Sequence, residues 1–308
     1  MKSLDSEFVF INKEDPSNLG IIQLAKYLRR IDHVFFNWIE NLPDRKGGII
    51  QSLLFPLMVA ALLVKGARIV WVMHNKISHK SSRLFRKKII FFLMSRVSHL
   101  IITHSFEGVS FLEAMNPQTK GRAVFLHHPV VVKRCPEPTI KKYDILIWGT
   151  MQPYKGILEF VRFWVESPRA QGLKVLIVGK FIDEHYYRSV SRYRTDNIEI
   201  VDAFIDDQKV LEYACQSRYV LFPYFGETVL SSGALMDSVG MLANIIGPRV
   251  GAFLDLAEIG IISLFSCYQD IVDIVRDSAD HPKRREDLLA FARDNSWDRF
   301  AQRITPYL

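Results

Sequence analysis

The segment from Gly149 to Gly156 combines residue types that suit the binding of a phosphate group. Gly149 and Gly156 let the backbone approach a ligand closely, and Lys155 adds a positive charge beside the free N–H groups of a helix start. A predicted strand over 144–148 precedes the segment and an amphipathic helix follows it. The segment therefore lies at the carboxyl end of a strand, where open α/β sheets bind ligands. The pattern predicts an anion site, and the alternative is an ordinary strand-to-helix turn.

A second segment of the same kind follows the predicted strand over 219–222. Ser231 or Ser232 can cap the next helix, and the amide of Gly233 would then point toward a ligand. Asp237 lies in that helix, and an ionised carboxylate accepts hydrogen bonds from sugar or ribose hydroxyls. Together the two segments predict a diphosphate site with a sugar beside it. The alternative for Asp237 is a polar residue on an exposed helix face.

The elements that must position these segments are short apolar strands that alternate with helices. Such alternation predicts an α/β fold with parallel sheets and crossover helices. The length of 308 residues suits two domains, and the segment 130–142, which contains Pro136 and Pro138, is predicted to link them. We expect an N-terminal domain over 1–135, a C-terminal domain over 141–295 and a cleft between the two.

Cysteines and apolar runs bear on the cell compartment. Cys135, Cys215 and Cys267 are far apart, show no metal-ligand spacing and are odd in number, so we expect no disulfide framework and a reducing compartment. The first residues run into a strand instead of an apolar signal core, which predicts no secretion. The longest apolar run, Leu53–Val64, has twelve residues, whereas a membrane span needs about twenty. We expect this run to form a buried helix.

Positive charge is concentrated in the first half of the chain. The net charge of +7 divides into +10 for residues 1–140 and −3 for residues 141–308, and residues 45–106 hold eleven Lys or Arg and no Asp or Glu. The densest part mixes large apolar residues with Lys76, Lys80, Arg83, Arg86, Lys87 and Lys88, as a membrane-surface segment does. A solvated helix face is the alternative. Binding of nucleic acid is a weaker interpretation, because no nucleic-acid motif accompanies the basic residues.

The order of the motifs resembles that of a known family. Neither half carries a Walker lysine loop or a Gly-x-Gly-x-x-Gly after its first strand, which disfavours kinases, ordinary ATPases and dehydrogenases. The chain resembles the retaining family-four glycosyltransferases of the GT-B fold through Tyr154-Lys155-Gly156, Val178-Gly179, Phe222-Pro223-Tyr224, Ser232-Gly233-Ala234-Leu235 and Gly247…Gly251. Trp71–Asn75 looks like the acceptor-domain strand that ends in a histidine, and Trp297 is similar to a tryptophan near the C-terminal crossover helix. The resemblance covers nearly the whole chain.

The resemblance implies two Rossmann-like domains whose parallel sheets face a central cleft, with a C-terminal helix at about 296–308 packing back on the N-terminal domain. It also implies transfer of a hexose from a UDP- or GDP-sugar with retention of configuration, in which Lys155 neutralises the leaving diphosphate. Catalytic roles are expected for Lys155, His74 and Asp237. The expected donor-binding residues are Gly149, Lys155, Gly156, Gly179, Glu227, Ser232, Gly233 and Asp237. The chain has no Asp-x-Asp pair, so we expect no metal and no cofactor besides the donor substrate.

Two departures from the family pattern lie in these same segments. The family usually has an arginine a few residues before the lysine, but this chain has no second cation between Gly149 and Lys155. Many members carry two glutamates eight residues apart, where this chain has Val229 and Asp237, with Glu227 as a substitute two residues away. A catalytically silent GT-B scaffold, or a membrane-associated partner of another transferase, is therefore an alternative. A sugar-nucleotide epimerase is disfavoured by the same motifs.

The acceptor side is predicted from strand ends in the first half. His74 can hydrogen-bond an acceptor hydroxyl or the donor sugar, although a lone histidine after a strand is often structural. Trp38 is a candidate for stacking on a sugar or, alternatively, a buried tryptophan, and Asn75 is a candidate ligand or cap. Arg83, Arg86, Lys87 and Lys88 are expected to face anionic lipid near an acceptor linked to polyprenyl diphosphate. We expect a cytoplasmic, peripheral membrane enzyme of cell-surface polysaccharide synthesis, such as capsule or exopolysaccharide.

Overall fold

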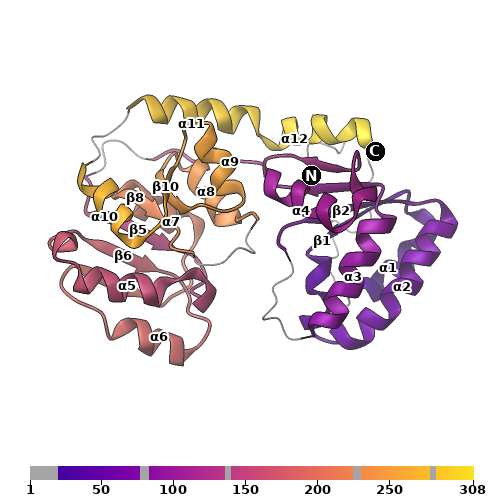
Figure 1. Ribbon diagram of the computed structural model, residues 1–308, viewed down its shortest axis with the longest axis horizontal. Helices are drawn as coiled ribbons and strands as arrows, with labels where there is room; N and C mark the ends of the chain where they lie inside the picture. Colours follow the sequence, from indigo (N-terminus) through magenta and orange to yellow (C-terminus); the bar gives the residue numbers. More distant parts are fainter. Residues whose placement is uncertain (1–19, 77–82, 136–139, 225–229, 278–281) are drawn as a thin grey trace. The chain divides into compact units, whose positions relative to one another are not determined.

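The computed structural model describes residues 20–76, 83–135, 140–224, 230–277 and 282–308, and the chain divides into two compact units (Figure 1). Unit 1 comprises Met1–His127, Thr228–Ser231 and Trp297–Leu308. Unit 2 comprises His128–Glu227 and Ser232–Ser296. The predicted strand over 8–11 and part of the predicted linker lie outside the described residues. The boundary after His127 precedes that linker.

Unit 1 is built on a parallel sheet in the order β1-β2-β3-β4. Its strands are β1 (His33–Asn37), β2 (Arg68–Met73), β3 (Leu100–Thr103) and β4 (Ala123–Phe125). In β2 every residue after Arg68 is buried, and β3 is buried throughout. Continuous apolar strands of this kind require cover on both faces of the sheet.

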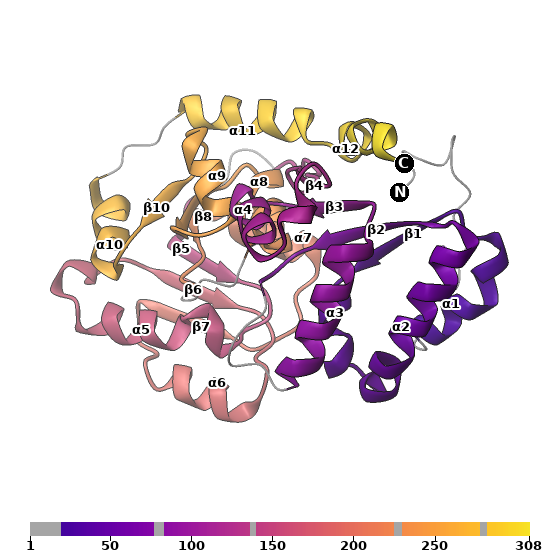
Figure 2. The same ribbon diagram turned by 45° about the vertical axis from the view of Figure 1, so that its right-hand side comes forward.

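Helices from the first half of the chain cover one face of this sheet. They are α1 (Ile21–Tyr27), α2 (Gly48–Lys65), α3 (Leu84–Val97) and α4 (Phe106–Met115), with the 3-10 turns η2 (Leu28–Arg30), η3 (Ile39–Asp44) and η4 (Pro117–Thr119). Their core joins Phe55 and Leu62 of α2 to Phe91 of α3 and Trp71 of β2. Figure 2 shows α1, α2 and α3 side by side below the sheet.

Helix α2 differs from the expectation of a buried helix. It is longer than the predicted run, spanning Gly48–Lys65, and its 18 residues have a mean hydropathy of 1.9, yet only 28% of them are buried. By length and composition alone, such a helix could cross a membrane. The prediction was wrong because an all-apolar sequence does not show which faces of a helix pack against the core. Here only the face that carries Phe55, Val59 and Leu62 does so.

The other face of the sheet is covered by the end of the chain. Ile304 of α12 (Trp297–Ile304) packs with Val70, Val72 and Ile102, and Phe300 and Leu308 lie against the same cluster. The main-chain carbonyl of Leu308, after the 3-10 turn η7 (Thr305–Tyr307), accepts hydrogen bonds from the side chains of Arg68 and His33. Unit 1 is therefore completed by residues that follow unit 2 in the sequence.

Unit 2 is built on a parallel sheet in the order β10-β9-β8-β5-β6-β7. Its strands are β5 (Tyr143–Trp148), β6 (Val175–Val178), β7 (Ile198–Val201), β8 (Ser217–Leu221), β9 (Asn244–Pro248) and β10 (Ser263–Phe265). The first three strands extend the sheet in one direction and the last three in the other. This is the order of a Rossmann-type sheet, and its reversal falls between β5 and β8.

The helices of unit 2 follow the amphipathic patterns of the sequence. They are α5 (Ile157–Glu166), α6 (Glu184–Ser191), α7 (Asp207–Cys215), α8 (Gly233–Gly240), α9 (Ala252–Glu258), α10 (Tyr268–Asp277) and α11 (Pro282–Asp294), with the 3-10 turns η5 (Pro153–Lys155) and η6 (Pro168–Ala170). In α5 the predicted face of Ile157, Phe160, Val161 and Trp164 is buried. Asp183 and Asp206 cap α6 and α7 by accepting backbone N–H bonds, as aspartates do at helix starts.

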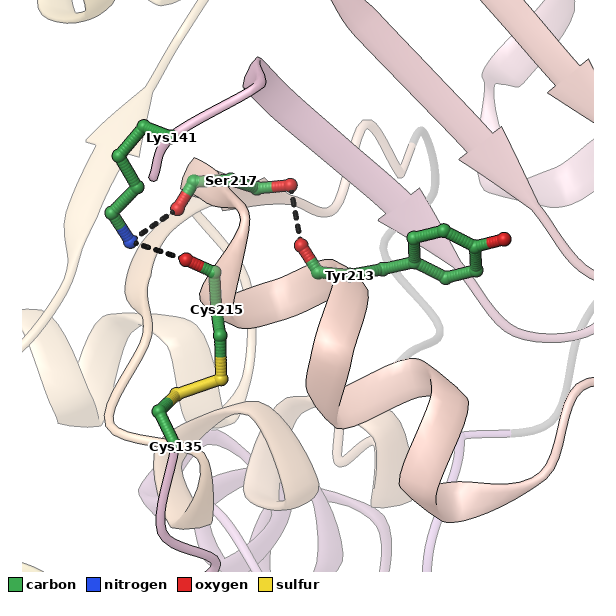
Figure 3. The surroundings of a disulfide bond; sticks show 5 residues. All are labelled: Cys135, Lys141, Tyr213, Cys215 and Ser217. Atoms are coloured by element: carbon green, nitrogen blue, oxygen red, sulfur yellow. Dashed lines mark hydrogen bonds between the residues drawn. A yellow bond between two sulfur atoms is a disulfide. The ribbon is translucent and has the colours of Figure 1, made fainter. Parts of the chain in front are cut away.

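A disulfide joins Cys135 to Cys215, which corrects the expectation of no disulfide framework (Figure 3). Their Cα atoms are 5.8 Å apart although 80 residues separate them in the sequence. Cys215 ends α7, and Cys135 lies in the segment that enters unit 2. Spacing along the chain carries no signal for a pair that only the fold brings together. The third cysteine, Cys267, is free and exposed.

We expect Cys135→Ser to lower the free energy of unfolding of unit 2 by about 2–4 kcal/mol under oxidising conditions, because the disulfide restricts the conformations of the unfolded chain. Urea denaturation with and without dithiothreitol measures this effect. In dithiothreitol the wild type and the variant should unfold alike. A difference that persists after reduction would mean that the serine acts through the folded state.

Glu40 in η3 is a buried carboxyl group that destabilises unit 1 when ionised. It is 3% exposed, and neither of its oxygens makes a hydrogen bond of good geometry within the described part of the chain. Burial raises its pKa to about 7, and its own backbone amide, the Trp71 indole, Lys87 and Arg45 only partly oppose this. The penalty is absent below the pKa of the unfolded chain, near 4.5, and complete above pH 7.

Glu40→Gln should therefore raise the free energy of unfolding by about 1–3 kcal/mol at pH 8 and change it little at pH 4.5. Thermal and urea unfolding across this pH range measure the effect. Glu258→Gln, at the exposed end of α9, is the matched control and should show no such trend. A gain for Glu40→Gln of equal size at both pH values would contradict the ionisation argument.

Candidate active site

The candidate site of unit 2 lies where the strand order reverses. The loop 149–156 follows β5, and Tyr224 follows the neighbouring strand β8. Strands to either side of such a reversal turn their connections in opposite directions and leave a crevice at their carboxyl ends, where α/β proteins bind ligands. The fold thus places the two predicted anion segments at the edge of the sheet that suits a ligand.

Glycines shape the loop because side chains would not fit there. Gly149 and Gly156 have φ values of 104° and 68°, which L side chains rarely adopt. A Cβ atom on Gly179, directly after β6, would lie 1.9 Å from the carbonyl oxygen of Gly149. The loop after β5 therefore rests directly on the backbone after β6. Gly179 acts through this close approach.

Lys155 is a buried cation with no acidic partner among the described residues. It is 9% exposed, and burial lowers its pKa to about 8. Its Nζ lies 5.7 Å from the centre of the Tyr224 ring, and a Cβ on Gly149 would be 3.6 Å from the same Nζ. A buried charge without a counter-charge is unfavourable, and a bound anion would relieve the penalty.

Tyr154 precedes this lysine in the sequence, and the ring of Tyr224 lies beside it. The rings of Tyr154 and Tyr224 lie 6.1 Å apart at an angle of 60°, and Tyr224 is 6% exposed. Burial raises the pKa of both phenols, so both stay neutral at physiological pH. The face of the Tyr224 ring favours the nearby cation, and neither phenol adds negative charge to the site.

Helix α8 supplies the second anion-binding element. Ser232 is its N-cap, with Oγ accepting a hydrogen bond from the Leu235 amide at 3.4 Å. The amides of Gly233 and Ala234 donate to no partner within the described residues, and a Cβ on Gly233 would meet open space. Free amides at a helix start attract an anion.

A hydrogen bond connects this helix to the loop after β5. The indole Nε1 of Trp148, directly before Gly149, donates to Ser238 Oγ at 3.0 Å, and Ser238 donates to the Ala234 carbonyl at 2.8 Å. Ser238 is fully buried. The end of β5 and the start of α8 are thus held together inside unit 2.

The carboxylate of Asp237 forms an ion pair with Lys133. Lys133 donates to its Oδ1 at 3.3 Å and to Asp207 at 3.2 Å, and the main chain of Lys133 is fixed by a 2.8 Å bond from its amide to the Gly240 carbonyl. Desolvation lowers the pKa of Lys133, but the two carboxylates outweigh it and raise this pKa overall. The Asp237 side chain keeps 48% of its surface exposed and can still accept further hydrogen bonds.

One expectation about the donor residues is wrong, and another concerns a residue outside the described part of the chain. The amide of Gly156 is not free for a ligand, because it donates to the Pro153 carbonyl at 3.1 Å in the turn of η5. Gly156 therefore contributes through its left-handed backbone, which starts α5. Glu227 lies outside the described residues.

In unit 1, polar rings gather at the carboxyl edge of the sheet. Trp38, after β1, stacks on His74, after β2, with ring centres 4.3 Å apart and planes 5° from parallel. His74 Nε2 lies 3.3 Å from Asn37 Oδ1. Trp38 has a left-handed backbone, φ 56°, and is 36% exposed, so it covers the buried imidazole without being buried itself. Asn75 is half-buried beside His74.

Further histidines lie along the same edge. His104, after β3, is 2% exposed, and its ring centre is 5.3 Å from that of His74. Its Nδ1 is 2.8 Å from the Leu126 carbonyl. His127, after β4, has a pKa lowered to about 4 by burial and then by Arg303. The imidazoles contribute polar atoms, and His127 stays neutral at physiological pH.

The basic residues of α3 and its start do not all face outward. Lys88 is exposed, Arg86 is half-buried, and Arg83 is exposed while donating to the Pro43 carbonyl. Lys87 differs from the expectation: it is 8% exposed and pairs with Asp44. It therefore belongs to the interior between α3 and η3. The helical period turns it inward although its neighbours, Arg86 and Lys88, are half-buried and exposed.

Several site residues carried no signal in the sequence. Lys133 lies 104 residues from Asp237, and a lysine in a proline-rich linker is ordinary. Trp148 and Ser238 are typical of a strand end and a helix interior. Tyr224 was recognised only as part of a family motif. Within the described residues, no group of three His, Cys, Asp or Glu side chains is arranged to hold a metal ion.

Solved structures similar to this chain share its two-unit architecture. HepE from Anabaena, in complex with UDP-glucose, has a TM-score of 0.71 at 11% identity over 94% of this chain and 82% of HepE. The lipopolysaccharide outer core galactosyltransferase WaaB has a TM-score of 0.62 at 12% identity over 93% of this chain and 78% of its own. WaaG, a glycosyltransferase involved in lipopolysaccharide biosynthesis, has a TM-score of 0.59 at 11% identity, over 81% and 80%.

These likenesses define the fold class. The chain has the α/β GT-B fold, with a parallel sheet in each of two Rossmann-like units. No model of a protein family matches the sequence, and no curated protein matches it either. Membership of family four and retention of configuration stay predictions.

We expect the affinity for UDP to fall as the pH rises above about 8. Binding of a diphosphate favours the charged form of Lys155, so above its pKa of about 8 binding must take up a proton, and affinity decreases by up to about tenfold per pH unit. Isothermal titration from pH 7 to 9.5, in buffers of different ionisation enthalpy, measures affinity and proton uptake. Lys174→Ala, at the exposed amino end of β6, should keep this dependence. An affinity that is flat across the range would contradict the assignment of Lys155.

Proposed function

We propose that this protein is a glycosyltransferase that moves a hexose from a UDP- or GDP-sugar to a saccharide acceptor. The observation that carries the proposal is the buried Lys155 at the strand reversal of unit 2, which has no acidic partner among the described residues. A protein keeps such a charge at a loss of stability unless a ligand compensates it. A nucleotide diphosphate at the carboxyl ends of β5 and β8 would do so, and HepE, similar in fold, was solved with UDP-glucose.

The chemistry of transfer matches the groups around Lys155. Departure of the nucleotide leaves negative charge on the diphosphate, and groups fixed in advance stabilise such charge best. Lys155 supplies a full positive charge, and the free amides of Gly233 and Ala234 supply the end of a helix. These groups act without a metal or a further cofactor. We propose a metal-independent reaction.

Asp237 is proposed to hold hydroxyls of the donor. Its exposed oxygens can accept hydrogen bonds from ribose or sugar, while Lys133 fixes the orientation of the carboxylate. Lys133 is thus a positioning residue. The raised pKa of Lys133 means that this ion pair persists throughout the physiological pH range.

The carboxyl edge of unit 1 is proposed to bind the acceptor. Trp38 offers an aromatic face of the kind on which sugar rings stack, and His74 beneath it is oriented by Asn37. Retention of configuration, with attack on the face that the diphosphate leaves, follows from the resemblance to family four. The basic residues of unit 1 support an acceptor linked to polyprenyl diphosphate. The enzyme would then act in the cytoplasm at the inner face of the membrane, in cell-surface polysaccharide synthesis.

A silent GT-B scaffold is the second candidate. The observation that favours it is the missing second cation in the loop. Met151, one of the residues where the family usually has an arginine, is fully buried, and its backbone pairs with that of Phe181. A scaffold of this kind would bind neither UDP nor GDP.

A donor screen separates the two candidates. With UDP- and GDP-sugars, the wild type should bind one nucleotide and hydrolyse its sugar slowly. Lys155→Ala should weaken nucleotide binding at least about tenfold, because one charge-assisted contact contributes about 1.5–3 kcal/mol. His74→Ala should keep nucleotide affinity and lose transfer. Lys174→Ala serves as the control for both.

Two outcomes would count against the enzyme. Absence of binding to any nucleotide in wild-type protein supports the scaffold. Nucleotide binding that is untouched by Lys155→Ala would place the diphosphate elsewhere. Circular dichroism of each variant shows whether the fold is retained.

A further inference from the structure

The outward face of α2 is apolar where a surface helix is normally polar. Ile50, Leu53, Leu57 and Val64 are 62%, 66%, 68% and 90% exposed. At 100° per residue these side chains lie opposite the buried face of Phe55, Val59 and Leu62. From Gly48 to Val64 the helix carries no charged residue. A helix that is apolar all round is expected inside a protein or in lipid, but α2 has only one face in the core.

The apolar surface continues onto α1 through a groove. The groove has a volume of about 240 Å³ and is lined only by apolar residues, namely Ile21, Ile22, Ala25, Leu28, Leu54, Leu57, Met58 and Ala61. Ile22 and Leu54 at its rim are 44% and 41% exposed. Monomeric soluble proteins seldom expose contiguous apolar surface of this kind without a partner.

Exposed cations flank the same helices, next to the acidic Asp44 of η3. Arg45 and Lys46 are exposed directly before α2, and Lys88 is exposed on α3, which packs against α2 (Figure 2). Residues 45–106 contain no Asp or Glu at all. An apolar face bordered by positive charge complements one surface in particular, a bilayer with an apolar interior and anionic headgroups.

We propose that the α1–α2 face of unit 1, defined by Ile22, Ile50, Leu53, Leu57 and Val64, docks into an anionic lipid bilayer with α2 lying in the plane of the interface. The groove between α1 and α2 would receive part of an acyl chain. This inference rests on the proposed function, since a lipid-linked acceptor would require the enzyme at such a surface. It moves the membrane contact from the basic segment at 76–96 to the apolar helix before it.

The core of unit 1 decides between lying on the membrane and crossing it. Phe55, Val59 and Leu62 are at most 1% exposed and pack on the strands, so a spanning α2 would have to leave the core. The 18 residues of the helix are about 27 Å long, shorter than the roughly 30 Å hydrocarbon layer. Partial burial from one side satisfies both constraints.

Vesicle flotation tests the proposal. Wild-type protein should bind vesicles of phosphatidylcholine with 25% phosphatidylglycerol and bind pure phosphatidylcholine more weakly. Leu53→Gln with Leu57→Gln should lower the partition coefficient about tenfold or more, since two large apolar side chains leave the lipid. Arg45→Glu with Lys46→Glu should remove the preference for anionic lipid. The control, Val165→Gln with Ile259→Gln, alters two exposed apolar residues of unit 2 and should bind as the wild type does.

Fluorescence distinguishes insertion from charge attraction alone. Leu57→Trp should give an emission that shifts to the blue on vesicles and is quenched by brominated acyl chains, and Val165→Trp should do neither. An unshifted, unquenched emission from Leu57→Trp overturns the proposal. So does a dimer in light scattering that the Leu53→Gln, Leu57→Gln variant dissociates, because the face would then be covered by a second copy.

The same variants separate this proposal from the enzymatic one. Leu53→Gln with Leu57→Gln should bind UDP or GDP as the wild type does. Vesicle binding without nucleotide binding in wild-type protein would leave the docking face standing and remove the transferase. Nucleotide binding without vesicle binding would do the reverse.

Discussion

A buried positive charge at the strand reversal is the constraint around which unit 2 is organised. Lys155 lies in a position where burial works against its charge and no described acid compensates it. No described neighbour neutralises this charge, so it remains available to a ligand. Gly149 lies close to its ammonium group, Gly179 lets the loop after β5 rest on the backbone after β6, and the neutral ring of Tyr224 lies beside it. A bound anion would recover the stability given up here.

Unit 1 handles charge in the opposite way. The carboxyl edge of its sheet carries imidazole and indole rings with little net charge, in which Trp38, His74 and Asn37 fix one another by stacking and hydrogen bonding. Exposed cations of this unit lie on its helices, such as Arg29 and Arg30 on η2, Lys65 on α2 and Lys88 on α3. One unit therefore buries a cation in its candidate site, and the other carries exposed cations on its helices. The division suits a protein whose two substrates differ in where they are delivered from.

The parts of this structure that the sequence predicted are those fixed by local pattern. The strand and helix around residues 149–156, the buried face of α5 and the Ser232 cap follow from apolar period and residue type. The parts that failed depend on direction or distance. Apolar periodicity could not tell that α2 turns apolar side chains outward, nor that Lys87 turns inward. The Cys135–Cys215 and Lys133–Asp237 pairs join segments about 80 and 100 residues apart, and no local pattern encodes such contacts.

The position of α12 in the sequence sets the order in which the two units can be completed during synthesis. While the chain is being made, unit 2 has all its strands before the ribosome reaches the residues that finish unit 1. Until Phe300 and Ile304 emerge, Val70, Val72 and Ile102 on one face of the first sheet lack the cover that these two residues provide. This face of the sheet therefore stays partly exposed while more than half of the chain is still being synthesised. We expect chaperones to bind the exposed sheet during this delay, until α12 is synthesised and covers it.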